Sequence, residues 1–138
     1  MRASVSVIIP IYNSGKYLRE AIDSVLAQRH RPLEVLVVDD GSSDNGPELA
    51  AGYGPQVRVI AIPHGGHPAA RNAGVAASTG DYLAFLDADD LWAANKLELQ
   101  LDAFASNPSL DLVFGHMQNF ISPELSAAKR RTIRFYAR

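Results

Sequence analysis

The sequence contains no cysteine among its 138 residues. This absence excludes disulfide bonds, thiolate zinc sites and a cysteine nucleophile. Long hydrophobic runs are also absent, because runs such as 82–86 are far shorter than the roughly 18–20 residues of a membrane span. The apolar stretch 5–9 is too short for a signal peptide, and we expect Pro10 to end it.

The composition that remains is typical of an ordinary folded domain. Hydrophobic residues make up 47% of the chain and charged residues 20%, which excludes a disordered chain, a collagen-like repeat and a coiled coil. A chain of 138 residues has the length of one domain and can bury a core of sufficient size.

Positive charge is scarce outside the last ten residues. Residues 129–138 hold five basic side chains and no acid, so residues 1–128 hold eight basic and 15 acidic side chains, a net charge of −7. An acidic body argues against a nucleic-acid partner, because such an interface needs a basic face. The basic segment could contact anionic lipid or phosphate, but we favour a solvated end.

Apolar runs alternate with helical spacings along the chain. Strands are predicted over 5–9, 33–38, 57–62, 82–86 and 110–115, and helices over 17–26, 47–51, 69–77 and 92–106. Residues 122–138 have only weak helical periodicity. Five strands that alternate with four helices predict an α/β fold with a mostly parallel twisted sheet and helices on both faces.

Polar, turn-forming residues follow three of the predicted strands. They occupy positions 10–13, 39–41 and 87–90. Parallel strands present their carboxyl ends at the same edge of a sheet, and ligands of such sheets bind beyond that edge. We therefore expect these three segments to converge on one site.

Asp87 and Asp89 are separated by one residue directly after a predicted strand. Alternate side chains of a turn can converge on Mg²⁺ or Mn²⁺, which prefer oxygen ligands. The alternative is an acidic turn before the next helix, with Asp90 placed to cap that helix. The position of the pair at a strand end, with a second acidic strand end in the chain, favours metal binding.

Asp39 and Asp40 end another predicted strand. A carboxylate there can accept a hydrogen bond from a base N–H or a ribose hydroxyl. The alternative is a turn capped by Ser42, Ser43 or Asp44. That alternative explains the two adjacent acids less well, because like charges near a sheet end cost energy without a ligand.

Arg71 follows a glycine-rich loop and lies at the start of a predicted helix, a position suited to a phosphate or a base edge. The alternative is an ordinary surface arginine. His64 and His67 lie beside two glycines, and we favour a pair of loop histidines over a metal site. The sequence lacks the dinucleotide-binding, P-loop and serine-hydrolase motifs, so those classes are not supported.

Four segments stand out together: VSVIIPIYN at 5–13, VVDDGSSD at 37–44, ARNAG at 70–74 and FLDADD at 85–90. In this order and spacing they resemble the family 2 glycosyltransferases, which have the GT-A fold, and the resemblance spans about residues 4–115. The resemblance implies a nucleotide-sugar donor, with a UDP-sugar expected first, together with Mn²⁺ or Mg²⁺. It also implies inverting transfer to an acceptor hydroxyl on an unknown sugar or lipid-linked acceptor.

The same resemblance assigns roles to individual residues. For nucleotide binding it implies Pro10, Tyr12, Asp39, Asp40, Arg71 and Asp87. For the metal it implies Asp89 first, with Asp87 beside it and nearer the ribose and diphosphate. In this interpretation the metal neutralises charge on the departing diphosphate, while a carboxylate base deprotonates the acceptor.

The catalytic base of the family is usually an acidic residue in a later part of the chain. After Asp111 this chain offers only Glu124, in no recognisable motif, so no base is assigned. We therefore expect residues 1–115 to form a nucleotide-sugar-binding core. Residues 116–138 would form a basic C-terminal extension, helical in part, with the acceptor region truncated or absent.

Two other functions stay open at this point. The first is a truncated or degenerate nucleotide-binding module without turnover. The second is a nucleotidyltransferase, which is weaker because no glycine-rich, basic triphosphate loop follows the first strand. We expect a cytoplasmic location, with the basic end able to lie against a membrane, and unpaired strand edges that would permit oligomers.

Overall fold

The computed structural model describes residues 3–124. Its elements are β1 (Val5–Ile11), α1 (Gly15–Leu26), β2 (Glu34–Asp39), α2 (Gly46–Ala51), the 3-10 helix η1 (Gly54–Gln56), β3 (Val57–Ala61), α3 (His67–Ala77), β4 (Tyr82–Phe85) and α4 (Lys96–Ser106). The alternation of strands and helices confirms the predicted α/β class. Within these residues, no helix combines the length and the hydrophobicity that crossing a membrane requires.

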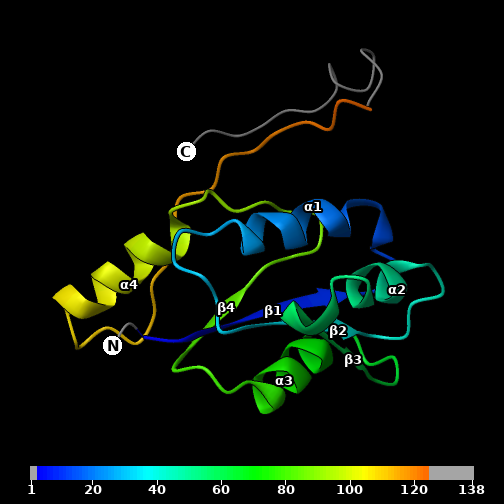
Figure 1. Cartoon of the computed structure of the whole chain (residues 1–138), viewed down its shortest axis with the longest axis horizontal. Coiled ribbons are helices and arrows are strands. Elements are labelled where there is room, and N and C mark those ends of the chain that lie inside the picture. The colour runs from blue at the N-terminus through cyan, green and yellow to red at the C-terminus, as the bar shows by residue number, and fades with distance from the viewer. Residues whose placement is uncertain (1–2, 125–138) are drawn as a thin grey trace.

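The four strands form one parallel sheet in the order β3-β2-β1-β4 (Figure 1). From β1 the chain builds outward through β2 to β3, and it then crosses back to place β4 on the other side of β1. The strand order therefore reverses between β1 and β4. In doubly wound sheets, ligands bind beyond the carboxyl ends of the strands at such a change.

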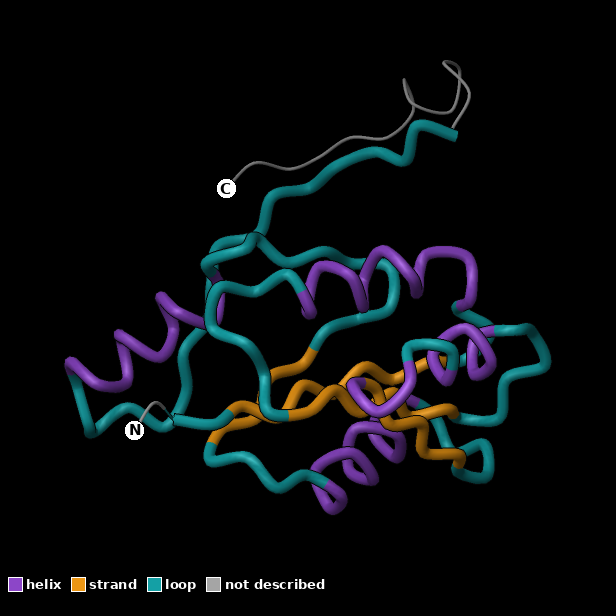
Figure 2. The backbone as a smooth tube through the Cα atoms, in the orientation of Figure 1, coloured by secondary structure: helices purple, strands orange, loops and turns teal. Residues whose placement is uncertain are grey.

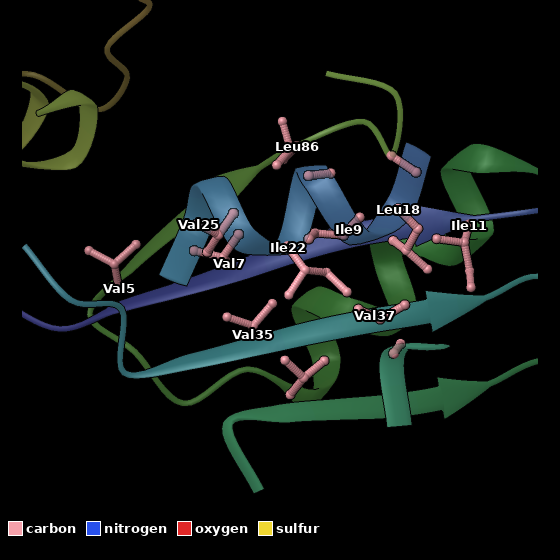
Figure 3. Close-up of a cluster of buried hydrophobic side chains, with 14 of the residues drawn as sticks. Val5, Val7, Ile9, Ile11, Leu18, Ile22, Val25, Val35, Val37 and Leu86 are labelled. Atoms are coloured by element: carbon pink, nitrogen blue, oxygen red, sulfur yellow. The ribbon is translucent and has the colours of Figure 1, made fainter. Parts of the chain in front are cut away.

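Helices cover both faces of the sheet, as predicted (Figure 2). On the α1 face, alternate residues of β1 and β2 pack with Leu18, Ile22 and Val25 in the larger hydrophobic cluster (Figure 3). On the α3 face, a smaller cluster surrounds Ile8. Gly74 of α3 lies so close to the sheet that a Cβ there would be 2.5 Å from Ile8 Cγ2. The small residues of α3 thus allow a close approach.

The prediction that Pro10 ends the first strand is wrong, because β1 continues through Pro10 to Ile11. Proline has no N–H and normally interrupts a central strand. The Leu86 N–H donates to the carbonyl of Ile8, which shows that the backbone groups of Ile8 face β4. In a parallel strand, Pro10 presents its nitrogen to that same side, beyond the last residue of β4, Phe85. The missing donor therefore falls where the pairing between β1 and β4 ends.

The helix predicted from residue 92 begins four residues later, at Lys96. Asp90 does not cap it. The side chain of the buried Gln28 lies at this terminus instead: its Oε1 accepts from the Leu97 N–H at 3.1 Å, and its Nε2 donates to the Ala93 carbonyl at 2.7 Å. A glutamine that is distant in sequence therefore sets where α4 begins.

The fifth strand predicted over 110–115 does not form, and this segment is irregular and largely exposed. A strand needs a neighbour for its backbone hydrogen bonds. In the described part of the chain, β4 pairs with β1 on one side and with no strand on the other. The helical prediction for 122–138 falls mostly outside the described residues.

Candidate functional site

The carboxyl ends of β1, β2 and β4 meet at one edge of the sheet, as the sequence predicts. Ile11 pairs with Asp39, and Ile8 pairs with Phe85. The turns that follow these strands therefore leave the sheet side by side, and α3 begins at the same edge (Figure 1). We refer to this end of the sheet as the carboxyl edge.

Asp40 is buried at the carboxyl edge, with 3% of its surface exposed. Its Oδ1 accepts from the Gly65 N–H at 2.7 Å, and its Oδ2 accepts from the Gly66 N–H at 2.9 Å. Its Oδ2 also lies 2.9 Å from His64 Nδ1. The Gly65 amide first, and then the Gly66 amide and the His64 ring, hold the pKa of Asp40 below its usual value despite burial.

Asp39 ends β2 and is 7% exposed. Its Oδ1 accepts from the Ser42 N–H at 2.9 Å, an Asx turn that shapes the chain after the strand. Within the described residues its Oδ2 has no hydrogen bond. The two adjacent acids therefore differ, because only Asp39 keeps an oxygen free for a ligand.

Tyr12 follows β1 and is 45% exposed. Its ring stacks on the ring of His64, with centroids 4.4 Å apart and planes inclined by 26°. The backbone of Tyr12 is held by Ser14, whose Oγ donates to the Tyr12 carbonyl and accepts from the Tyr12 N–H. The two rings form an exposed aromatic surface beside Asp39 and Asp40.

Arg71 and Asp87 come together from α3 and from the turn after β4. Arg71 Nη2 donates to Asp87 Oδ1 at 2.9 Å, and both side chains are about half exposed. Arg71 Nε is buried and has no hydrogen-bond partner within the described residues. A buried donor without an acceptor costs free energy, so this nitrogen is suited to receive an acceptor from a ligand.

Asp89 lies in a turn closed by the Asp90 N–H, which donates to the Asp87 carbonyl at 3.0 Å. The side chain of Asp89 is exposed and has no hydrogen-bond partner in the described part of the chain. Partial desolvation, and then the negative charges of Asp89 and Asp87, raise the pKa of Asp90 above its usual value. Negative charge thus accumulates at this turn.

The donor set of this turn suits Mg²⁺ or Mn²⁺. Asp87 and Asp89 offer carboxylate oxygens, which these cations prefer, and a cation would relieve the repulsion around Asp90. Residues 3–124 contain no group of three or more His, Asp and Glu side chains that could hold a metal. A cation here would therefore need further oxygens from water and from a ligand such as a diphosphate.

Sequence reasoning included Asn13 in a segment of the site but gave it no role, and in the structure it joins the turns after β1 and β2. Its Oδ1 accepts from the Ser43 N–H at 2.7 Å, and its N–H donates to Ser42 Oγ at 3.0 Å. Asn13 has a φ of 50°, a left-handed conformation that asparagine tolerates better than most residues. An asparagine two residues after the end of a strand was the available signal. Asp44, interpreted only as a cap of the next helix, also accepts from the Gly15 N–H of α1 at 2.8 Å.

Two predicted residues lie apart from this cluster. Pro10 is buried within β1, and His67 is exposed at the start of α3. His64, interpreted as one of a pair of loop histidines, contacts Asp40 and Tyr12. Two surface hollows, of about 340 and 410 Å³, lie away from these residues, one of them between α1 and α2. The candidate site is thus defined by its polar groups and aromatic rings.

Comparison with known proteins gives one family. The sequence model of glycosyl transferase family 2 matches residues 6–137. An uncharacterized glycosyltransferase of Rickettsia typhi is 34% identical over 137 residues, which cover 92% of this chain and 43% of the relative. The glycosyltransferase GlyG of Streptococcus pneumoniae is 34% identical over 124 residues, which cover 87% of this chain and 41% of the relative. The chain spans less than half the length of these curated relatives.

Solved structures give the same fold. The crystal structure of S. aureus TarS in complex with UDP-GlcNAc has a TM-score of 0.70 and 29% sequence identity, over 76% of this chain and 32% of that one. The mannosyltransferase PcManGT from Pyrobaculum calidifontis, in complex with GDP-Man and Mn²⁺, has a TM-score of 0.68 and 30% identity, over 76% of this chain and 33% of that one. Both likenesses support the GT-A fold that the resemblance implied.

Proposed function

The chain belongs to glycosyl transferase family 2, and on that premise we propose that its described residues bind the nucleotide-sugar donor of a glycosyltransferase. One observation carries this proposal: an exposed tyrosine ring, a half-free carboxylate, an unpartnered arginine nitrogen and an acidic turn converge at the carboxyl edge. The first donor class to test is a UDP-sugar, because a structural neighbour binds UDP-GlcNAc, and the second is GDP-mannose.

The nucleoside end of the donor would lie at Tyr12 and Asp39. An aromatic ring offers a face on which a base can stack. The free Oδ2 of Asp39 can accept a hydrogen bond from a base N–H or a ribose hydroxyl. The Asx turn to Ser42 fixes this carboxylate, so it is oriented before a ligand arrives.

The diphosphate end would lie between Arg71 and the acidic turn. The guanidinium of Arg71 keeps a donor free at Nε, and charged donors of this kind bind phosphate oxygens strongly. Asp89 and Asp87 would hold Mn²⁺ or Mg²⁺, which when bound neutralises negative charge on the departing diphosphate. Arg71 meanwhile holds Asp87 in place through Nη2.

We further propose inverting transfer, in which a carboxylate base removes the proton of an acceptor hydroxyl as that hydroxyl attacks from the face opposite the nucleotide. No residue in 3–124 is assigned to this role, since Glu124 forms an exposed ion pair with Lys16. The acceptor, sugar or lipid-linked, and any contact with a membrane or a second copy stay predictions. The basic segment that would meet lipid lies outside the described residues.

Thermal unfolding tests donor binding directly. The chain is heated with Mn²⁺ and, in separate samples, UDP, UDP-GlcNAc, GDP and GDP-mannose. A ligand present at a hundred times its Kd stabilises the folded state by about 2.7 kcal/mol, which raises Tm by several degrees. Asp89→Ala should remove the Mn²⁺-dependent part of that rise. Asp102→Ala, which truncates an exposed aspartate of α4, should leave it unchanged.

The outcomes separate binding from turnover. If none of the four nucleotides raises Tm at high concentration, the donor-binding proposal is wrong. A rise in Tm without release of free sugar or transfer to any acceptor would favour the binding module without turnover. Detectable donor hydrolysis would favour the transferase.

A further inference from the structure

The chain that follows the acidic turn, 87–90, passes along α1 before α4 begins (Figure 1). Residues 91–95 form no helix or strand, so their backbone polar groups need partners elsewhere. Three hydrogen bonds join this segment to the end of α1: from the Trp92 N–H to Ser24 Oγ at 3.2 Å, from Gln28 Nε2 to the Ala93 carbonyl at 2.7 Å and from the Arg29 N–H to the Ala94 carbonyl at 2.9 Å. We call these three contacts the α1 clamp.

We propose that Gln28 and Ser24 are positioning residues for the metal, which act through the α1 clamp to place Asp89. Neither residue contacts a ligand in this proposal, because both lie toward the far end of the helix that starts at the carboxyl edge. The inference rests on the proposed donor-binding function, in which Asp89 holds Mn²⁺ or Mg²⁺.

Gln28 uses both ends of its side-chain amide to hold the segment. Its Nε2 donates to the Ala93 carbonyl at 2.7 Å and to the Ser24 carbonyl at 3.2 Å, and its Oε1 accepts from the Leu97 N–H at 3.1 Å. Gln28 is 3% exposed, so its loss would leave buried backbone groups without partners. The two carbonyls and the one N–H also fix the orientation of the amide.

Ser24 is oriented to accept from the Trp92 N–H. Its hydroxyl donates to the Ala21 carbonyl of its own helix at 2.7 Å, which leaves the oxygen lone pairs for Trp92. The Trp92 side chain packs against the larger hydrophobic cluster. Both the backbone and the side chain of Trp92 are therefore held.

The clamp limits where Asp89 can lie. Asp89 is three positions before Trp92, and three residues of extended chain reach no further than about 11 Å. On its other side the acidic turn is joined to β1 through the Leu86 N–H, which lies 3.1 Å from the Ile8 carbonyl. The turn is therefore fixed on both sides.

The Asp89 side chain has no partner of its own to fix it. Asp87 is oriented by Arg71 Nη2 at 2.9 Å, whereas the carboxylate of Asp89 forms no hydrogen bond within residues 3–124. The backbone alone therefore places Asp89. Mg²⁺ requires near-octahedral geometry with oxygens at about 2.0–2.1 Å, so a displaced turn would bind the cation less well.

The competing explanation is that Gln28 only sets where α4 begins. UDP binding is measured by calorimetry, in Mn²⁺ and again in EDTA, for the full chain, Gln28→Met and Ser6→Ala, well below the Tm of each. Methionine is flexible and unbranched but forms none of the hydrogen bonds of glutamine. Ser6→Ala also breaks buried hydrogen bonds, but near the amino end of β1, and is the matched control for lost stability.

The quantity compared is the factor by which Mn²⁺ strengthens UDP binding. We expect Gln28→Met to reduce this factor about tenfold, the low end of the cost of losing groups that orient metal ligands. The UDP affinity in EDTA should stay at the wild-type value, and Ser6→Ala should leave the factor unchanged. An unchanged factor in Gln28→Met, or an equal reduction in both variants, overturns the inference.

Ser24→Ala is a milder test, which gives a result even if Gln28→Met does not fold. It removes only the acceptor of the Trp92 N–H, the clamp contact nearest the acidic turn. We expect it to reduce the Mn²⁺ factor about threefold, less than the fivefold that one net hydrogen bond is worth. Ser106→Ala removes a serine that bonds only to the Asp102 carbonyl of its own helix and should leave the factor unchanged. Equal factors in the two serine variants would overturn the inference.

Hydrogen exchange in the wild-type chain tests the coupling without a variant. If the clamp places a metal ligand, the bound metal must in turn stabilise the clamp, because coupling between two sites is reciprocal. Mg²⁺ added to a chain saturated with UDP should slow exchange of the Trp92 and Leu97 N–H groups. The Gly80 N–H, which donates to Ser6 Oγ, should exchange as before. Slowing at none of the three groups, or at all three alike, contradicts the inference.

Failure of this inference can be distinguished from failure of the proposed function. If the wild-type chain binds neither UDP nor GDP with Mn²⁺, both are wrong. If UDP binds but Mn²⁺ adds nothing, the metal site and this inference are wrong, while nucleotide binding stands. If Asp89→Ala removes the Mn²⁺ effect and Gln28→Met keeps it, the metal site stands and the role of the clamp is wrong.

Discussion

The two ends of the parallel sheet both carry acids, serines and glycines, but these groups are satisfied differently. At the amino edge, where the strands begin, Glu34 Oε1 accepts from Ser6 Oγ at 2.7 Å and from the N–H and Oγ1 of Thr79. Ser6 Oγ in turn accepts from the Gly80 N–H at 2.9 Å. Each of these donors has its acceptor within the fold.

At the carboxyl edge, residues of the same kinds have polar groups without a hydrogen-bond partner in the described part of the chain. Arg71 Nε, the carboxylate of Asp89 and one oxygen of Asp39 have no partner within the described residues. Asp40, between them, accepts hydrogen bonds on both oxygens, whereas Glu34 accepts them on Oε1 alone. Residue type alone therefore does not separate the acids that we propose face a ligand from those that hold the fold together. What sets the carboxyl edge apart is the buried Arg71 Nε and the Asp89 carboxylate, neither of which has a partner within the described residues.

The largest effect should come from closing space at the amino edge with Gly80→Ala. The new Cβ would lie 2.7 Å from the backbone nitrogen of Ser6 and 3.1 Å from the carbonyl carbon of Val5, and neither can move without shifting β1. We expect a loss of about 2–3 kcal/mol in the free energy of unfolding, measured by urea titration.

Gly115→Ala is the matched control for this change. A Cβ at Gly115 would meet nothing closer than Gln100 Nε2 at 3.9 Å, so the stability should stay within about 0.5 kcal/mol. The folded fraction of Gly80→Ala should bind nucleotide as wild type does. A selective loss of nucleotide affinity would mean that the amino edge is coupled to the site.

A smaller effect, and a pH-dependent one, is expected for Glu34→Gln. Burial opposes ionisation of Glu34, but the hydrogen bonds from Ser6 and Thr79 outweigh it, and the pKa is lowered from its usual 4.5. A lowered folded-state pKa stabilises the protein above pH 4.5, and this contribution is lost as the pH falls below that value. At pH 7 the variant should lose about 1–2 kcal/mol of stability.

Urea titrations of this variant from pH 7 to pH 3 check the sign. The difference in the free energy of unfolding between wild type and Glu34→Gln should become smaller as the pH falls through the lowered pKa. Glu20→Gln, at an exposed position on α1, should have the same free energy of unfolding as wild type at every pH. A stability difference between wild type and Glu34→Gln that increases at low pH would contradict the assignment of Glu34 as an ionised acceptor.

At the carboxyl edge, Arg71→Lys should weaken nucleotide binding. Lysine keeps the charge, but its three N–H donors share one nitrogen, so it cannot replace both Nη2, which binds Asp87, and Nε. Nucleotide affinity should fall about fivefold to tenfold by calorimetry, with stability within about 0.5 kcal/mol of wild type. Arg31→Lys, at an exposed position, is the control. A drop in stability with unchanged affinity would make Arg71 a structural residue, like Glu34.

The sequence predicted most of the fold because burial is periodic within each element. The four strands and four α-helices of the structure all correspond to predicted segments. The errors depend on distant partners. Pro10 lies where the pairing of β1 with β4 ends, and α4 begins where Gln28 meets Leu97, 69 residues away in sequence. Residues 110–115 have the pattern of a strand but no neighbouring strand among the described residues.

The convergence of these residues at one edge was predictable, but the hydrogen bonds that each of them makes there were not. Parallel strands must bring their carboxyl ends together, so Asp39, Asp87 and Arg71 were expected at one edge. Which of two adjacent acids faces inward depends on where the turn 64–66 lies. That turn follows a different strand and carries His64, a residue without a motif of its own.

The smallest effect is expected for Glu124→Gln, at an ion pair with Lys16 whose two side chains are 63% and 59% exposed. The hydrogen bond to Glu124 raises the pKa of Lys16, but solvent and salt screen such exposed pairs. We expect Tm to change by no more than about 1 °C and nucleotide affinity to stay at the wild-type value. A paired surface group should contribute little to stability or to nucleotide binding. A loss of nucleotide affinity in Glu124→Gln would therefore contradict the inference that the groups without a partner are the ones that bind the ligand. It would also return Glu124 to consideration as a residue that contacts the ligand.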